Sequence, residues 1–215
     1  MIRGLNTFQT WRAVLDYCNK HARIYKDRKN RVCIESLHVS FELLDFEDIT
    51  RPITVLSHVE KWMYPSPEQI RQAILFPSIN ARTAYSYGHR LFDYEGFNQI
   101  DQKIIPLLQK DPNTRQAVAS LILGKKETTQ PSMELDIPAI VSIDFKIRDD
   151  TLVVCFFLRS SDILIGLPAN MYQAYVLGQY VQKQVQTSKI AVVFHLASAH
   201  YFEDCQDIYQ KVMRS

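Results

Sequence analysis

The chain has 215 residues, of which 47% are hydrophobic, and a formal net charge of +2. This length suits one sizeable core, so we expect a single domain over residues 1–215. The net charge is too small to argue for a nucleic acid polymer or a membrane as partner, and the apolar runs are far shorter than the roughly 20 residues that span a bilayer. The four cysteines are scattered without a CxxC pair, and no amino-terminal signal pattern is present, which together predict a reduced, cytoplasmic protein.

The first half of the chain divides into short segments with different apolar spacing. Phe8, Trp11 and Leu15 begin a series with steps of three and four residues, which puts them on one face of a helix. Pro65 and Pro67 cannot sit inside a helix and therefore mark a turn. In chain order we expect a helix over residues 7–25, a break at 27–30, a strand over 32–44, helices over 55–63 and 68–75, a loop over 80–96, a helix over 97–110, a strand over 116–123 and a polar loop over 124–131.

The second half of the chain has clearer periodicity. Apolar residues fall on every second position of residues 141–147, which predicts a strand with one buried face. Asp149 and Asp150 then turn the chain into the apolar run 152–158. Such an uninterrupted run predicts the second strand of a hairpin, buried on both faces.

A long helix, a strand and a last helix complete the pattern. Residues 167–185 have helical spacing, and Pro168 lies in the first turn, where its missing N–H costs nothing. We expect a strand over 190–196 and an amphipathic helix over 201–212. Because helices and strands mix without strict alternation, the sequence predicts an α+β fold around a mostly antiparallel or mixed sheet.

The stretch from Arg159 to Met171 sets an arginine, an aspartate, a glycine and an asparagine among apolar residues. Polar groups in such surroundings are costly unless partnered, so they either complete a core network or face a ligand. Three further motifs accompany it: Tyr87-Gly88-x-Arg90, Asp111-Pro112-Asn113-Thr114-Arg115 and His195-Leu196-Ala197-Ser198-Ala199-His200. Together they closely resemble thymidylate synthase and its relatives, the pyrimidine-nucleotide hydroxymethylases. The resemblance implies a thymidylate-synthase-like mixed sheet packed on helices, shortened at its C-terminal end.

The resemblance also implies roles for individual residues. In that family the arginine of the signature and the arginine of the proline turn hold the nucleotide 5′-phosphate, and the second one reaches across a dimer interface. A guanidinium offers a rigid fork of donors that suits phosphate oxygens. A homodimer is therefore expected. The resemblance assigns phosphate or nucleotide binding to Arg28, Arg115, Arg159, Ser160, Gly166 and Asn170, and contact or proton-transfer roles to Asp162 and His195.

One departure from the family concerns the nucleophile. The family's cysteine, twenty residues before the signature arginine, is replaced here by Ala139. A methyl group cannot add to the pyrimidine ring as a thiolate does, so we do not expect canonical thymidylate synthesis. The sequence favours a divergent member that binds a nucleotide or related phosphorylated heterocycle. Cysteine-independent one-carbon transfer with methylene-tetrahydrofolate is one version, and an inactive nucleotide-sensing or scaffolding homologue is the alternative.

The candidate residues also have purely structural interpretations. Arg159 and Asp162 could form an internal ion pair, and Asn170 could cap the long helix. Arg115 after a proline turn is typical of a solvated charge. His195 belongs to a histidine pair that indicates packing rather than a metal, because no further Cys, Asp or Glu spacing supports zinc. We therefore expect no metal site.

Overall fold

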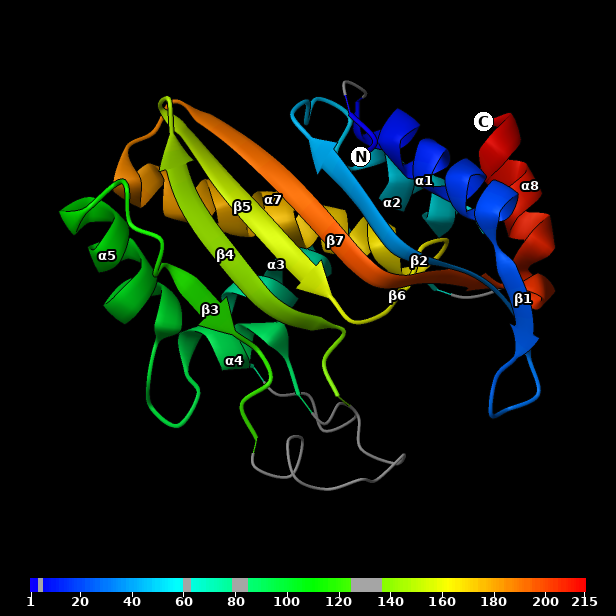
Figure 1. Ribbon diagram of the computed structural model, residues 1–215, viewed down its shortest axis with the longest axis horizontal. Coiled ribbons are helices and arrows are strands. Elements are labelled where there is room, and N and C mark those ends of the chain that lie inside the picture. Colours follow the sequence, from blue (N-terminus) through cyan, green and yellow to red (C-terminus); the bar gives the residue numbers. More distant parts are fainter. Residues whose placement is uncertain (4–5, 60–62, 79–84, 125–136) are drawn as a thin grey trace.

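The structure is a computed structural model that describes residues 1–3, 6–59, 63–78, 85–124 and 137–215. Its elements are arranged in space as in Figure 1. The strands are β1 (Arg23–Lys26), β2 (Val32–Leu43), β3 (Val118–Ser120), β4 (Ile140–Arg148), β5 (Thr151–Leu158), β6 (Ser161–Asp162) and β7 (Lys189–Phe202). The helices are α1 (Thr7–His21), α2 (Arg51–Ser57), α3 (Pro67–Leu75), α4 (Tyr87–Phe92), α5 (Ile105–Lys110), α7 (Gly166–Val185) and α8 (Gln206–Arg214), with a π-helical turn at Ile100–Ile104 and a 3-10 turn at Glu203–Cys205.

The strands form one seven-stranded mixed sheet. Its order is β1-β2-β7-β5-β4-β3, and β6 pairs with β7 beyond the end of β5. β7 runs parallel to β5 and β6, whereas the other pairs are antiparallel. The chain passes from β6 to β7 through α7, as a parallel connection requires. The predicted α+β fold with a mixed sheet is therefore confirmed.

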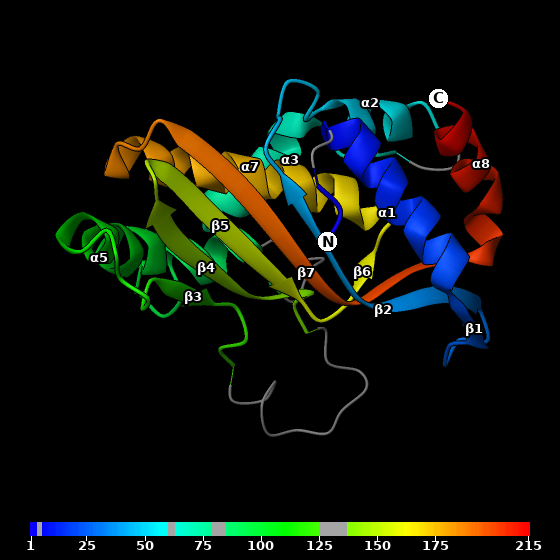
Figure 2. The ribbon, with the colours of Figure 1, turned by 45° about the horizontal axis from the view of Figure 1, so that its top comes forward.

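The helices lie on one side of this sheet. In Figures 1 and 2, α7 lies behind β4, β5 and β7, while α1, α5 and α8 lie at the margins of the sheet, and the other face of β2, β7, β5 and β4 carries none of the described helices. β5 shows the division, since Val154 and Phe156 are buried while Phe157 is 37% exposed. The prediction that this strand is buried on both faces is wrong for the single chain, because its second face looks out from the uncovered side.

Two contacts attach the helices closely to the sheet. A methyl group on Gly178 of α7 would lie 3.3 Å from Ile190 Cγ2, so the absence of a side chain lets α7 approach β7. Trp11 of α1 is fully buried and donates from Nε1 to the Ile163 carbonyl at 2.7 Å. α1 therefore fixes the segment that leads from β6 into α7.

The central strands change the face that they bury at one level of the sheet. β2 buries Val39 and Phe41 at alternate positions, but the next buried residue toward its start is Ser36. His38 lies at this change with φ 57°, in the left-handed region that non-glycine residues seldom occupy. In β7 the buried residues likewise pass from Leu196 to Ala199. At the end of the sheet that carries β6, the alternation of buried and exposed positions in β2 and β7 is therefore shifted relative to the rest of the sheet.

Several predicted boundaries were wrong. The opening helix ends at His21, because the chain turns there into β1, and the last helix starts late because β7 continues to Phe202. Residues 51–57, not 55–63, form α2, and only Val118–Ser120 of the strand expected over 116–123 is formed. The expected loop over 80–96 contains α4, and its residues 80–84 lie outside the described part of the chain. Most of the expected loop over 124–131 also lies outside the described part.

Among the described residues, no helix is both long enough and apolar enough to cross a membrane. The cytoplasmic location stays a prediction.

Candidate functional site

Arg159 follows β5 and lies beside the position of the missing nucleophile. Its backbone N–H donates to the Ala139 carbonyl at 2.9 Å. Its guanidinium donates from Nε to the Pro138 carbonyl at 3.0 Å and from Nη2 to the Ile137 carbonyl at 2.6 Å. The guanidinium is thus oriented by these carbonyls and not by the Asp162 carboxylate, so the internal ion pair was the wrong alternative. The residue is exposed, which leaves the outer side of the fork accessible.

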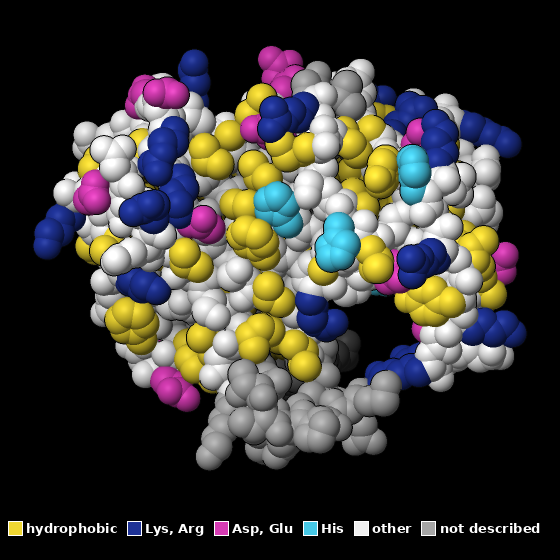
Figure 3. Space-filling model, in the orientation of Figure 1, with side chains coloured by type: hydrophobic (Ala, Val, Ile, Leu, Met, Phe, Trp, Pro, Cys, Tyr) yellow, Lys and Arg dark blue, Asp and Glu magenta, His cyan; other side chains and the backbone are white. Residues whose placement is uncertain are grey.

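Arg159 and His195 line the same pocket on the uncovered face of the sheet. The pocket has a volume of about 550 Å³, within the usual range for sites that take small molecules. Hydrophobic side chains surround the histidines on this face in Figure 3. The lining residues are His38, Ser40, Val141, Phe157, Leu158, Arg159, His195, Leu196 and Ala197.

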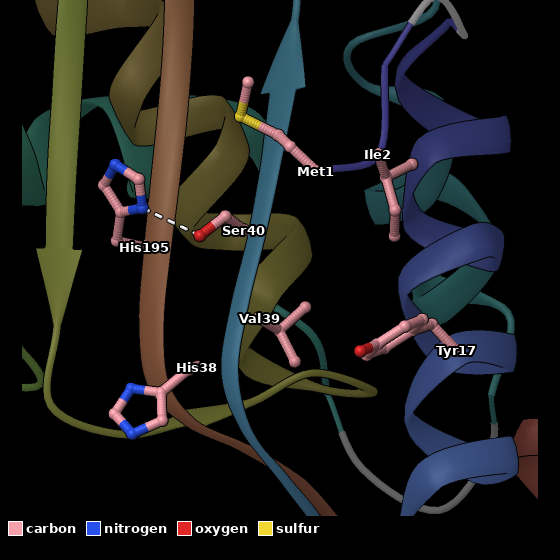
Figure 4. Close-up of a pocket in the computed structure, with 7 residues that line it drawn as sticks. All are labelled: Met1, Ile2, Tyr17, His38, Val39, Ser40 and His195. Atoms are coloured by element: carbon pink, nitrogen blue, oxygen red, sulfur yellow. Dashed lines mark hydrogen bonds between the residues drawn. The ribbon is translucent and has the colours of Figure 1, made fainter.

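A second pocket adjoins the first across β2. It has a volume of about 370 Å³ and lies between β7, β2, the first residues of the chain and Tyr17 of α1. Figure 4 shows its lining residues, of which His38, Ser40 and His195 also line the first pocket. The full lining is Met1, Ile2, Tyr17, His38, Val39, Ser40 and His195.

Asp162, also part of the signature, lies on β6 next to a histidine of β7. Its Oδ1 accepts from the backbone N–H groups of Leu164 at 3.1 Å and Ile165 at 2.9 Å, which shapes the turn into α7. His200 is its register partner on β7, and His200 Nδ1 lies 3.4 Å from Ser160 Oγ. Burial raises the pKa of Asp162, and burial lowers the pKa of His200. Both groups are therefore biased toward their neutral forms.

This bias predicts a pH dependence of stability. Because the pKa of Asp162 is raised on folding, the folded protein holds a proton over a pH window in which the unfolded chain has released it. The free energy of unfolding should therefore fall as the pH rises from about 4, the unfolded value, through the folded pKa. Asp162→Asn keeps an oxygen for the two amides but cannot ionise. We expect it to be more stable than the parent at pH 7 and to lose this part of the slope in urea unfolding.

His200 needs a control, because its contribution has the opposite sign. Its lowered pKa makes the free energy of unfolding rise with pH up to about 6.5, where the unfolded imidazole has lost its proton. His200→Gln, measured alone and together with Asp162→Asn, separates the two slopes. Identical pH profiles for the parent and Asp162→Asn would contradict the burial of an ionisable carboxyl.

Gly166 and Asn170 lie on α7. Gly166 begins the helix, and a methyl group there would lie 3.8 Å from Asp162 Cβ. Asn170 is half-buried and donates from Nδ2 to Gln173 Oε1 at 3.2 Å. The helix has Ile165 at its N-cap without a side-chain cap, so the capping interpretation of Asn170 is wrong. Neither residue lines the two pockets described above.

The other two predicted phosphate ligands lie apart from Arg159. Arg115 is exposed and precedes β3, which runs antiparallel to β4 and pairs with residues 142–144, so the chain before β3 extends toward the hairpin end of the sheet. Arg159 follows the opposite end of β5, whose eight residues span about 25 Å. Arg28 is exposed in the turn between β1 and β2. Figure 3 shows a hollow between that projecting hairpin and the body, with Lys and Arg side chains on both sides.

Tyr87 was missed as a site residue, although its motif was recognised. It begins α4, and its side chain lies near the backbone of Ala139 and Ile140. Burial raises its pKa, so the phenol is neutral at physiological pH. The position of this tyrosine in the Tyr-Gly-x-Arg motif was the available signal. Cys155 does not replace the absent nucleophile, because burial raises the pKa of its thiol to about 11.

Comparisons with known proteins agree on one family. A model of the thymidylate synthase family matches residues 39–215. A protein of Methanosarcina barkeri named "Putative thymidylate synthase" is 24% identical over 100% of this chain and 94% of its own length. A protein of the same name from Methanocaldococcus jannaschii is 30% identical over 64% of this chain and 63% of its own length. The Methanosarcina mazei protein of the same name is 24% identical over 100% of this chain and 94% of its own length.

Proposed function

Because the chain belongs to the thymidylate synthase family, we propose that it binds a nucleoside 5′-monophosphate or a related phosphorylated heterocycle. One observation carries the proposal: Arg159 and His195, which the resemblance assigns to the phosphate and the sugar, line the same pocket. The guanidinium is held by backbone carbonyls, so it is oriented before a phosphate arrives. A thiolate addition at residue 139 has no place in this function, because Ala139 has no nucleophilic atom.

Calorimetry tests this function directly. Uridine, cytidine, adenosine and guanosine 5′-monophosphates, in ribose and deoxyribose forms, are titrated into the protein, with the matching nucleosides as controls. The proposal expects at least one monophosphate to bind more tightly than its nucleoside, because only the monophosphate can pair with Arg159. Equal or absent binding for every pair would exclude a nucleotide-phosphate site.

We further propose that two copies associate through the uncovered face of the sheet. The family typically forms dimers. On this chain Val118 and Phe157 are 36% and 37% exposed, and Leu37 is 47% exposed. Burying these exposed apolar side chains between two copies would stabilise their association. A partner would also explain the separation of Arg115 from Arg159, since the Arg115 of one copy could reach the pocket of the other.

A mixing experiment tests whether the two arginines are shared between copies. Arg115→Ala and Arg159→Ala are each expected to bind nucleotide weakly as purified proteins. After unfolding and refolding as a mixture, a heterodimer has one pocket without either arginine and one with both. About a quarter of the parent's sites should then recover full affinity, since half of the dimers are mixed and each has one intact pocket. No recovery in a mixture that refolds to dimers would contradict sharing.

A second candidate function is one-carbon transfer without a cysteine. The family uses methylene-tetrahydrofolate as cosubstrate, and Asp162 is the residue that the resemblance assigns to it. Its Oδ1 accepts from two amides, and the neutral form favoured by burial could donate a hydrogen bond, which suits a heterocycle with amide-like groups. Bound methylene-tetrahydrofolate would supply a carbon at the formaldehyde level, and hydroxymethyl transfer with water needs no reductant.

Labelled methylene-tetrahydrofolate separates this candidate from an inactive homologue. Incubation with electron-rich aminopyrimidine nucleotides is expected to move the label to the heterocycle if transfer occurs. Nucleotide binding without label transfer would favour the sensing or scaffolding alternative. Asp162→Asn is the matched variant, because it keeps the turn into α7 but removes the ionisable group.

A further inference from the structure

We infer that Ser40 is a positioning residue that orients His195, so that the Nε2 atom of His195 meets the ligand. The inference rests on the proposed nucleotide site but concerns a residue that the resemblance does not assign. Ser40 lies on β2 directly opposite His195 on β7. Its Oγ lies 2.8 Å from His195 Nδ1, a full hydrogen bond between half-buried groups.

A second contact fixes the plane of the imidazole. His195 is the register partner of Phe157 on the parallel strand β5. The two rings stack with centroids 5.0 Å apart and an interplanar angle of 24°. The hydrogen bond sets which nitrogen faces β2, and the stacking sets the tilt of the ring. Holding both removes rotational freedom that ligand binding would otherwise have to restrict.

The remaining nitrogen is therefore directed away from Ser40. Figure 4 shows Nδ1 bonded to Ser40 and the other ring nitrogen on the far side of the ring from Ser40. His195 lines the same pocket as Arg159, so this nitrogen belongs to a side chain of the proposed site. Within the described part of the chain no hydrogen bond occupies Nε2. A hydroxyl can donate or accept, so Ser40 can support the imidazole in either tautomer while the ring orientation stays the same.

The same geometry places the Ser40–His195 pair where the two pockets meet. Ser40, His195 and His38 are the residues that both pockets share. Loss of the Ser40 hydroxyl would allow the imidazole to turn toward the second pocket, which Tyr17 and Met1 line. Ser40 thus acts on ligand binding through His195 and does not itself need to touch the ligand.

Nitrogen NMR of histidine-labelled protein tests this inference. His195→Gln assigns the His195 signals, and cytidine or uridine 5′-monophosphate is then added to the parent, Ser40→Ala and Ser40→Thr. In the parent we expect the ligand to shift Nε2 of His195 and leave Nδ1 nearly unchanged. Ser40→Ala should move the Nδ1 signal before any ligand is added and weaken binding roughly five- to ten-fold, the usual effect of one hydrogen bond. Ser40→Thr keeps a hydroxyl and should restore both.

The outcomes separate this inference from the nucleotide proposal. If no monophosphate binds the parent, the proposed function fails, while the free-protein Nδ1 signal in Ser40→Ala still decides whether Ser40 orients the ring. An unchanged Nδ1 signal in Ser40→Ala overturns the inference. So does a ligand shift at Nδ1 of the parent, or equal binding by Ser40→Ala and Ser40→Thr.

Discussion

Arg159→Ala is expected to weaken binding of a nucleoside 5′-monophosphate by about 30- to 100-fold, as loss of a charge-assisted, bidentate contact commonly does. The guanidinium is accessible at the pocket and already oriented by the Ile137 and Pro138 carbonyls. Arg159→Lys keeps the charge but loses the planar fork, so its affinity should lie between that of the parent and that of Arg159→Ala. Calorimetry with the monophosphate that binds the parent measures the series.

The nucleoside without its phosphate is the matched control for this prediction. It should bind the parent and Arg159→Ala equally, because the removed contact is to the phosphate alone. Arg159 also supports the segment before Ala139, so thermal unfolding of each variant must accompany the titration. A variant that melts as the parent does and binds the monophosphate equally well would remove Arg159 from the site.

Gly88→Ala is expected to lower the free energy of unfolding by about 3 kcal/mol or more, at the upper end of overpacking effects. A methyl group on Gly88 would lie 2.1 Å from the Phe76 carbonyl oxygen and 2.8 Å from the Phe76 carbonyl carbon. These are backbone atoms at the end of α3, so the clash can be relieved only by separating α3 from α4. For a chain of this length the midpoint of thermal unfolding should fall by roughly 10 °C.

Gly166→Ala provides the control at another helical glycine. The nearest atom to its added methyl group would be Asp162 Cβ at 3.8 Å, an ordinary contact. We expect its midpoint of thermal unfolding to equal that of the parent or to rise slightly. If Gly88→Ala and Gly166→Ala have the same midpoint of thermal unfolding, the close approach of α3 and α4 is not the reason for a glycine at position 88.

Strong periodicity explains which parts of the fold could be predicted. The alternation in β4 and the helical spacing in α7 gave elements close to those observed, because one face of each packs on the core. The sequence did not show that β1 would form, since its residues are all exposed and it pairs with β2 at the edge of the sheet. α4 was missed because it is only 6 residues long and includes a glycine, and its helical form depends on packing of Gly88 against α3.

The site could be predicted only as far as a linear motif reaches. The motif located Arg159 and His195, and the fold places both at one pocket. It could not show Ser40, because that residue belongs to β2 and meets His195 only through strand pairing across a long stretch of chain. It also could not show that Asp162 lies beside His200, since β6 is short and its pairing depends on α7 returning the chain to β7.

The central position of β7 also constrains how the chain is made. β7 pairs with β2, β5 and β6, so the two halves of the sheet meet on it. During synthesis β2 and the β4–β5 hairpin emerge first, each with an unpaired edge, and must wait until α7 and then β7 have left the ribosome. Unpaired edges are templates for pairing with other chains. The nascent protein is therefore exposed to aggregation through these edges until β7 is translated.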